Sequence, residues 1–281
     1  MTRLLIGTDL DRTLLPNGDA PESAGARELF RHLGEQPEVR LVYVTGRDPG
    51  LVDEAITTWG VPVPDLLVAD VGATIAEPAK GSWRRWESWD ERIAADWRGV
   101  SPEMLHGLVA GVAGLRPQPA SRQAAGKRSF FTPAAAEGMG VAAAVRTKLE
   151  AAGVRANVIW SQDDITGDGL LDILPAGATK RKALEFVLDR WGFGLQEAMF
   201  AGDSGNDLDA LVGPIPAVLV ANASSGVRTE ARWQAAAENL ESSLYCARGG
   251  FLGMNGHYAA GILEGVAHFH PAWKRRLEEG M

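Results

Sequence analysis

The chain contains 281 residues, and its content of 23% charged and 46% hydrophobic residues is that of a folded globular protein. Such a composition excludes a disordered chain, and no apolar run approaches the length of a membrane-spanning helix. A net charge of −8 argues against a nucleic-acid partner, because binding to phosphate backbones needs concentrated lysine and arginine. We therefore expect neither nucleic acid nor a membrane as a partner. The single cysteine, Cys246, cannot form an internal disulfide, which favours a reducing cytoplasmic location.

Strand and helix patterns alternate at both ends of the chain. In the first part, apolar strands are predicted at 4–8, 39–44 and 66–69, with helices at 22–33 and 51–59 between them. In the last part, helices are predicted at 182–191 and 259–268, with strands at 198–201 and 217–220. Alternation of this kind is typical of βαβ units. It predicts an α/β fold with a doubly wound, Rossmann-like parallel sheet.

The middle of the chain has a different pattern. Four tryptophans come early in it, followed by a predicted helix at 134–152 and a short strand at 157–160. This pattern is typical of an α+β module inserted into the parallel sheet. We therefore expect one domain made of residues 1–80 and 171–281, and an inserted domain at 81–170.

Residues that could carry chemistry follow four predicted strands of the outer domain. They are Asp9-Leu10-Asp11-Arg12-Thr13, Thr45-Gly46-Arg47, Lys180 after a strand at 172–175, and the segment from Gly202 to Asp207. Two carboxylates at the mouth of a buried strand are costly unless a cation or a phosphoryl group shares the space. The carboxyl ends of parallel strands are where open α/β sheets place their active sites. Alone, the aspartate pair could be a surface turn or a helix N-cap, and Thr45-Gly46 could be a turn. Lys180 could be a solvated helix residue, and the segment from Gly202 to Asp207 a loop that ends in an N-cap. Their recurrence at strand ends nevertheless predicts a phosphoryl-transfer site with a divalent cation.

This ordered set resembles the haloacid dehalogenase-like superfamily of phosphotransferases, with residues 81–170 in the place of its type II cap. Further stretches resemble the sucrose-phosphate phosphatases, namely 202–207, 221–223, 261–269, 115–118, Gln123 and 127–130. The resemblance implies a phosphatase core at 1–80 and 171–281 and a substrate-specificity cap at 81–170. It also implies a Mg²⁺-dependent phosphoric monoester hydrolase that acts on a sugar phosphate, with sucrose 6-phosphate as the expected substrate.

The resemblance implies two catalytic carboxylates. Asp9 would attack phosphorus and form an aspartyl-phosphate, and Asp11 would protonate the departing sugar oxygen and then activate water. Because Asp11 must first be protonated, we expect neighbouring carboxylates to raise its pKa. The implied metal ligands are Asp9, Asp203 and the backbone carbonyl of Asp11.

The remaining implied site residues surround these carboxylates. Asn206 and Asp207 would orient the metal ligands, and the phosphoryl oxygens would be bound by Thr45, Gly46 and Lys180. In the cap, side chains suited to sugar hydroxyls are Gln118, Gln123, Lys127 and Ser129, although each could also be a solvated loop residue.

Four departures from the family pattern affect the expected substrate. Arg12 stands where sucrose-phosphate phosphatases usually have Asn or Gly, and Ala73 replaces an expected hydroxyl residue. Segments 161–169 and 248–256 are also longer than expected. The exact sugar therefore stays open. Phosphates of mannosylfructose, glucosylglycerol or glucosylglycerate are the alternatives within the same chemistry.

Two other classes of protein are alternatives. A phosphosugar mutase shares this core and a related cap, but it must protect its aspartyl-phosphate from water. An inactive domain attached to a sugar-phosphate synthase would lack a catalytic carboxylate, whereas Asp9, Asp11 and Asp203 are all present. The partners that we expect are a small sugar phosphate and, in addition, a sugar-phosphate synthase.

Overall fold

The computed structural model describes residues 3–124, 126–162 and 166–280. Contacts divide the chain into two compact units. The first contains Met1–Gly72, Ala76–Arg85 and Lys180–Met281, and the second contains Ala73–Ile75 and Trp86–Thr179. Within the described ranges, none of the helices is long and apolar enough to cross a bilayer.

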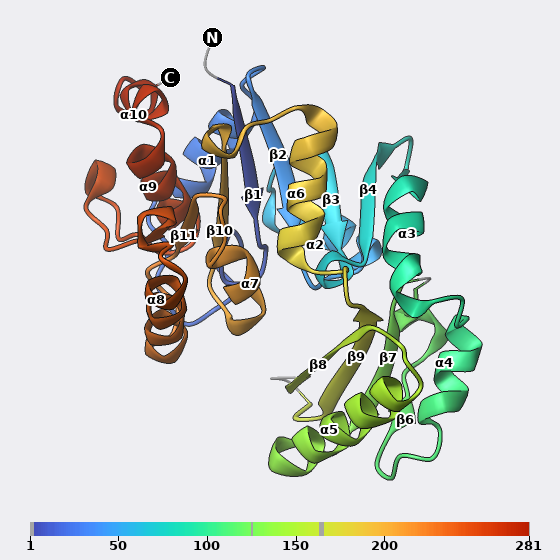
Figure 1. The fold of residues 1–281 in the computed structure, drawn as a ribbon. Helices are drawn as coiled ribbons and strands as arrows, with labels where there is room; N and C mark the ends of the chain where they lie inside the picture. Colours follow the sequence, from blue (N-terminus) through green and yellow to red (C-terminus); the bar gives the residue numbers. More distant parts are fainter. Residues whose placement is uncertain (1–2, 125, 163–165, 281) are drawn as a thin grey trace. The chain divides into compact units, whose positions relative to one another are not determined.

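The first unit is built on an eight-stranded sheet with the strand order β12-β11-β10-β1-β2-β3-β4-β5 (Figure 1). Its strands are β1 (Leu4–Thr8), β2 (Val39–Val44), β3 (Leu66–Ala69), β4 (Thr74–Ala79), β5 (Ser82–Arg85), β10 (Ala198–Gly202), β11 (Ala217–Leu219) and β12 (Leu244–Cys246). From β12 through to β3 the pairs are parallel, and β5 returns antiparallel to β4. The predicted parallel α/β core is therefore confirmed, and β1 lies inside the sheet with β10 and β2 on its two sides.

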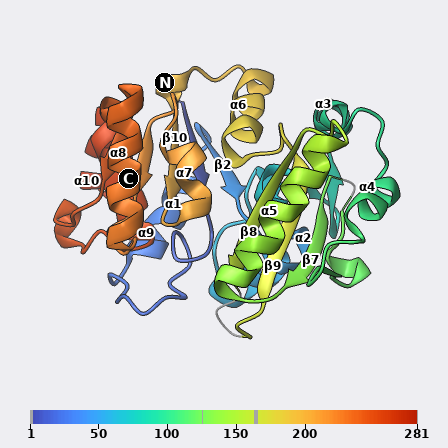
Figure 2. The same ribbon diagram turned by 60° about the horizontal axis from the view of Figure 1, so that its bottom comes forward.

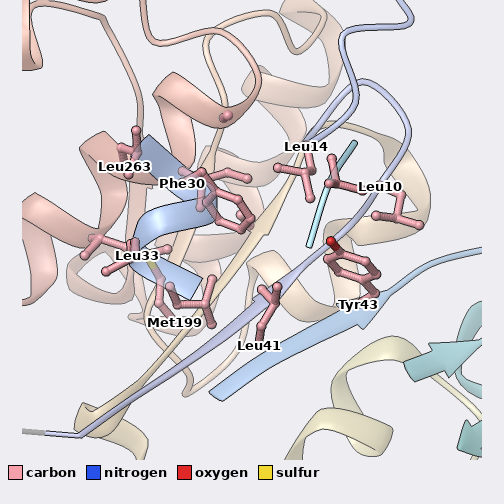
Figure 3. Packing of buried hydrophobic residues seen from close by; sticks show 14 of the residues in the cluster. Leu10, Leu14, Phe30, Leu33, Leu41, Tyr43, Met199 and Leu263 are labelled. Carbon is pink, nitrogen blue, oxygen red and sulfur yellow. The ribbon is translucent and has the colours of Figure 1, made fainter. Parts of the chain in front are cut away.

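Helices cover both faces of this sheet, because successive residues of a buried strand point to opposite sides. Leu4 and Ile6 of β1 belong to a buried cluster with α1 (Ala26–Gly34) and α9 (Ala259–Phe269). Figure 3 shows Phe30 and Leu33 of α1 packed near Leu263 and Met199 in this cluster. Further helices of the unit are α2 (Pro49–Trp59), α7 (Leu208–Leu211), α8 (Ser225–Glu238) and α10 (Pro271–Glu278).

The opposite face of β1 meets α6 (Lys180–Trp191) at very short range. Gly7 lies beneath Leu184, and a Cβ atom at Gly7 would be only 3.0 Å from a methyl carbon of that leucine. Any side chain at position 7 would therefore force the helix or the leucine to move. The absence of a side chain at this glycine lets α6 pack directly against the central strand.

The second unit has its own sheet and its own core. The sheet has the order β6-β7-β9-β8, with antiparallel pairs throughout, and its strands are β6 (Arg116–Pro117), β7 (Arg128–Thr132), β8 (Ala156–Gln162) and β9 (Gly169–Pro175). The helices are α3 (Glu87–Ala94), α4 (Pro102–Val109) and α5 (Ala135–Ala151). Figure 2 shows α5 lying along β8 and β9, where Val145 and Leu149 join the buried cluster of this unit. The unit is an α+β module.

The strand predicted at 172–175 belongs to a different sheet from the one expected. Residues 172–175 are expected to precede Lys180 in the outer domain, but β9 pairs with β7 and β8 in the second unit. Lys180 instead begins α6, and four residues separate it from the end of β9. The second unit also reaches Thr179 and leaves β5 to the first, so its bounds differ from the expected 81–170. Of the segment 161–169, residues 163–165 lie outside the described residues.

Candidate active site

Three neighbouring parallel strands bring polar side chains to one edge of the large sheet. β1 ends at Thr8, and the backbone N–H of Asp9 donates to the carbonyl of Ala201 in β10 at 2.9 Å. Asp203 comes directly after β10, and Thr45 comes directly after β2. All three polar side chains are buried. The carboxyl ends of β10, β1 and β2 thus form the floor of a candidate active site.

Lys180 is the cation at the centre of this site. Its ammonium nitrogen lies 3.1 Å from Asp9 Oδ1 and 2.7 Å from Asp207 Oδ1, and it donates to Asn206 Oδ1 at 3.2 Å. Only 1% of Lys180 is exposed. Burial lowers the pKa of Lys180, but Asp207 and Asp9 outweigh it and raise the pKa above its ordinary value. The lysine therefore stays charged, as a buried ammonium between two carboxylates must.

Asp207 fixes the loop that carries Asp203. Its Oδ2 accepts hydrogen bonds from the backbone N–H groups of Asp203 at 3.1 Å and Ser204 at 3.0 Å. Asp203 Oδ1 accepts from the hydroxyl of Thr13 at 3.1 Å, and Arg12 Nε lies 3.2 Å from Asp203 Oδ2. The carboxylate of Asp203 is thus held from its own loop and from the loop after β1.

The carboxylates of this site have the chemistry of a divalent-cation site. Ligand oxygens of Asp9, Asp203 and Asp207 all lie within 4.8 Å of one another. Burial raises the pKa of Asp9 to about 8 against the charge of Lys180, and the neighbouring carboxylates add to the rise. Burial and Asp207 likewise raise the pKa of Asp203 to about 6. Hard carboxylate oxygens suit Mg²⁺, and a bound dication would relieve this crowding of negative charge.

Asp11 differs from its expected state. Burial raises its pKa, but hydrogen bonds and charge from Arg47, together with Asn17, outweigh burial and bring the pKa below its ordinary value. Arg47 donates to Asp11 from Nε at 2.8 Å and from a terminal nitrogen at 2.7 Å, and Asn17 Nδ2 donates at 2.6 Å. The expected raised pKa is therefore wrong for this state of the protein. The neighbouring carboxylates matter less than one arginine, which the sequence places 36 residues away.

The phosphate-binding residues expected after β2 lie beside that arginine. The hydroxyl of the buried Thr45 accepts a hydrogen bond from the backbone N–H of Arg47 at 3.2 Å, and Gly46 between them is exposed. The Thr45-Gly46-Arg47 turn thus places a hydroxyl and a guanidinium at the same edge of the sheet. The sequence analysis assigns no role to Arg47 or Asn17, although the place of Arg47 in the turn that follows β2 indicates a position at this edge of the sheet.

The expected substrate-binding side chains of the second unit form a polar network around β7. Gln123 Nε2 donates to the backbone carbonyls of Gln118 at 3.0 Å and Ser129 at 2.9 Å, and its Oε1 accepts from the backbone N–H of Ser129 at 2.9 Å. The Ser129 hydroxyl donates to Asp172 at 2.5 Å. Lys127 and Ser129 are buried, so the alternative of a solvated loop residue is wrong for these two. The structure brings Gln118, Gln123 and Ser129 together, and it adds Asp172, which the sequence did not single out.

The fold is that of the haloacid dehalogenase-like phosphatases. A solved structure of the sucrose-phosphatase from Synechocystis, in complex with sucrose and phosphate, aligns with a TM-score of 0.73 and 25% identity, covering 96% of this chain and 98% of that one. A protein of Nitrosococcus oceani described as a HAD-like hydrolase is 41% identical over 99% of this chain and 75% of its own length. The class that the fold and the carboxylate cluster define is thus a phosphohydrolase of this superfamily.

The family within this superfamily follows from the sequence match. Residues 2–270 match sucrose-6F-phosphate phosphohydrolase, and the chain belongs to this family. It is accordingly a hydrolase of the sugar phosphatase class, and the resemblance seen in the motifs is confirmed. Sucrose-phosphatase 1 of Nicotiana tabacum is 29% identical over 95% of this chain, which spans 59% of the length of that relative.

Proposed function

We propose that the chain hydrolyses a sugar phosphate, with sucrose 6-phosphate as the first candidate, through an aspartyl-phosphate on Asp9 and with the help of Mg²⁺. The observation that carries this proposal is the buried cluster in which Lys180 lies 3.1 Å from Asp9 and beside Asp203 and Asp207. A carboxylate attacking a phosphate dianion is opposed by charge repulsion. A fixed ammonium and a bound dication reduce that repulsion and stabilise the transferring group.

The chain's own residues account for both half-reactions. In the first, a carboxylate oxygen of Asp9 bonds to phosphorus while the bond from phosphorus to the sugar oxygen breaks. Asp11 gives that oxygen its proton, and for this step it has to be protonated against the effect of Arg47 on its pKa. In the second, Asp11 takes a proton from water, whose oxygen bonds to phosphorus as the bond to Asp9 breaks, which releases phosphate and restores Asp9. Asp9, Asp203 and the carbonyl of Asp11 would hold Mg²⁺, which supplies Lewis-acid stabilisation of the phosphoryl oxygens.

Arg47 is the positioning residue for Asp11 in this proposal. Its two hydrogen bonds fix the carboxylate side chain, while Thr45 and Lys180 offer contacts for phosphoryl oxygens. We expect Arg47→Met to lower kcat on the sugar phosphate by about ten- to a hundredfold, the size of a lost general-acid contribution. With p-nitrophenyl phosphate, whose leaving group needs no protonation, the rate of the first half-reaction should fall less than about threefold. Because Asp11 acts in the second half-reaction with either substrate, single-turnover release of sugar and of p-nitrophenol measures this difference.

Two controls separate this role from a general loss of structure. Arg27 makes a comparable paired contact with Glu22 through Nε and a terminal nitrogen, so Arg27→Met should leave both rates unchanged. Arg47→Lys keeps the charge and should recover part of the sugar-phosphate rate. Equal losses on the two substrates would show that Arg47 acts on binding or folding rather than through Asp11.

The second unit is the proposed cap that selects the sugar. Its polar network offers amide, hydroxyl and carboxylate groups from Gln118, Gln123, Ser129 and Asp172. Lys127 adds a buried ammonium. Groups of these types recognise sugar hydroxyls by hydrogen bonds, and a site built for such bonds discriminates strongly against analogues that lack them.

A phosphate-release screen tests the proposed substrate. The purified chain is incubated with the phosphates of sucrose, mannosylfructose, glucosylglycerol and glucosylglycerate, each with Mg²⁺ and with a chelator in its place. We expect the highest kcat/KM on sucrose 6-phosphate and loss of turnover in the chelator. Steady release of one phosphate per sugar would exclude a mutase. A preference for another glycoside phosphate would overturn the choice of sugar, and release unaffected by the chelator would overturn the role of the metal.

We also propose a cellular context for this reaction. Hydrolysis consumes the sugar phosphate that a sugar-phosphate synthase forms. Such a synthase is therefore the partner that we propose for this chain. The cytoplasm would suit both the substrate and the single thiol of Cys246, which is buried and free of any disulfide.

A further inference from the structure

Arg12 has an unusual backbone that two other segments hold in place. Its φ angle is 56°, in the left-handed region that residues other than glycine seldom adopt. The Arg12 N–H donates to Asn17 Oδ1 at 2.8 Å, and its carbonyl accepts from Asn222 Nδ2 at 2.6 Å. These two side chains fix the peptide groups on both sides of Arg12. The backbone of Arg12 is therefore held in one conformation in the loop after β1.

That conformation brings the guanidinium of Arg12 to Asp203. Arg12 Nε lies 3.2 Å from Asp203 Oδ2, while the hydroxyl of Thr13 donates to the other oxygen at 3.1 Å. Both oxygens of Asp203 thus have partners from consecutive residues of one loop. The Asp203 side chain is only 4% exposed, whereas that of Arg12 is 52% exposed. The arginine is therefore the more exposed member of this pair, and it reaches the carboxylate from the solvent side.

A guanidinium on Asp203 competes with a metal ion for the same oxygen. Asp203 is a proposed ligand of the divalent cation, and like charges within a few ångströms repel strongly in a partly buried site. We propose that Arg12 occupies Asp203 in the metal-free protein, neutralises it there, and must leave Oδ2 when the cation binds. The arginine thereby stabilises the metal-free state and weakens the affinity for the cation. This inference rests on the proposed cation site, and it adds a residue that tunes how fully that site is loaded.

The inference predicts tighter metal binding once the guanidinium is removed. Arg12→Asn keeps a residue that tolerates the left-handed backbone, and Arg12→Gly removes the backbone cost altogether. Calorimetric titration of chelator-treated protein with Mg²⁺ should give a Kd about three- to tenfold lower for both variants, the range of a lost ion pair. Arg12→Lys retains the charge and should stay closer to the wild-type Kd. In thermal melts, Mg²⁺ should raise Tm more in Arg12→Asn than in the wild type.

A matched control removes the same charge elsewhere. Arg31 lies on α1 and pairs with Glu28 and Glu35, so Arg31→Asn should leave the Kd for Mg²⁺ within about twofold. An unchanged or higher Kd in folded Arg12→Asn and Arg12→Gly would overturn the inference while leaving the proposed function intact. If the wild type bound no Mg²⁺, the inference would fall together with the metal role. If Arg31→Asn tightened binding equally, net charge rather than Arg12 would be the cause.

Discussion

Replacement of Asp9 by asparagine should lower phosphate release by at least about a thousandfold while leaving the fold intact. Asparagine has the shape of aspartate, but its amide cannot form the bond to phosphorus. Stability should change little, because asparagine removes one charge from a crowded group of buried carboxylates, whose crowding together with burial raises the pKa of Asp9. Phosphate release on the preferred sugar phosphate and a thermal melt of each protein measure the two effects.

The control for this variant is another aspartate on the same unit. Asp189 is exposed on α6, and Asp189→Asn should keep both wild-type turnover and wild-type Tm. Turnover near the wild-type rate in Asp9→Asn would show that Asp9 is not the nucleophile. If Asp9→Asn lowered the Tm but kept the wild-type turnover per folded molecule, Asp9 would have a structural role only.

Replacement of Lys180 by methionine should be costly for both stability and catalysis. The variant leaves Asp9 and Asp207 buried without their common cation, and removal of one partner from a buried ion pair costs about 3–5 kcal/mol. Turnover should fall at least about a hundredfold, because the ammonium no longer offsets the charge of the transferring phosphoryl group. Urea unfolding gives the change in free energy, and phosphate release at saturating substrate gives the change in kcat.

A second variant separates these two losses. In Lys180→Met with Asp207→Asn, the uncompensated charge of Asp207 disappears, so much of the lost stability should return while turnover does not. The exposed Lys182 on the same helix provides the matched control, and Lys182→Met should unfold like the wild type. If Lys180→Met were as stable and as active as that control, the ammonium would be neither a structural nor a catalytic cation.

The strands that carry the site could be predicted well from sequence, because their signal is local. A continuous apolar run such as Leu4–Thr8 is buried on both faces, and such runs are typical of parallel strands between helices. The same locality explains the error at β9. Burial alternates over its first five residues, and its last three residues are all buried, so this mixed pattern does not say which sheet the strand joins.

The electrostatic state of the site depends on contacts that no local pattern shows. The Asp9–Lys180 pair could be anticipated as members of one site, because both belong to recognisable motifs. The pairing of Asp11 with Arg47 could not, since it depends on the course of the chain after β2 and on the direction of a long side chain. The contact of Arg12 with Asp203 likewise depends on a left-handed backbone angle that the residue type does not predict.

The glycine beneath α6 sets a distance in the active site. Gly7 and Asp9 are two residues apart at the end of β1, and Leu184 and Lys180 are one helical turn apart on α6. The close packing of Gly7 against Leu184 therefore lies next to the contact between Asp9 and the ammonium group of Lys180. Gly7, which has no functional group, thus helps to set the distance between Asp9 and Lys180. The geometry of this ion pair therefore depends on the absence of a Cβ atom at Gly7 as well as on polar side chains.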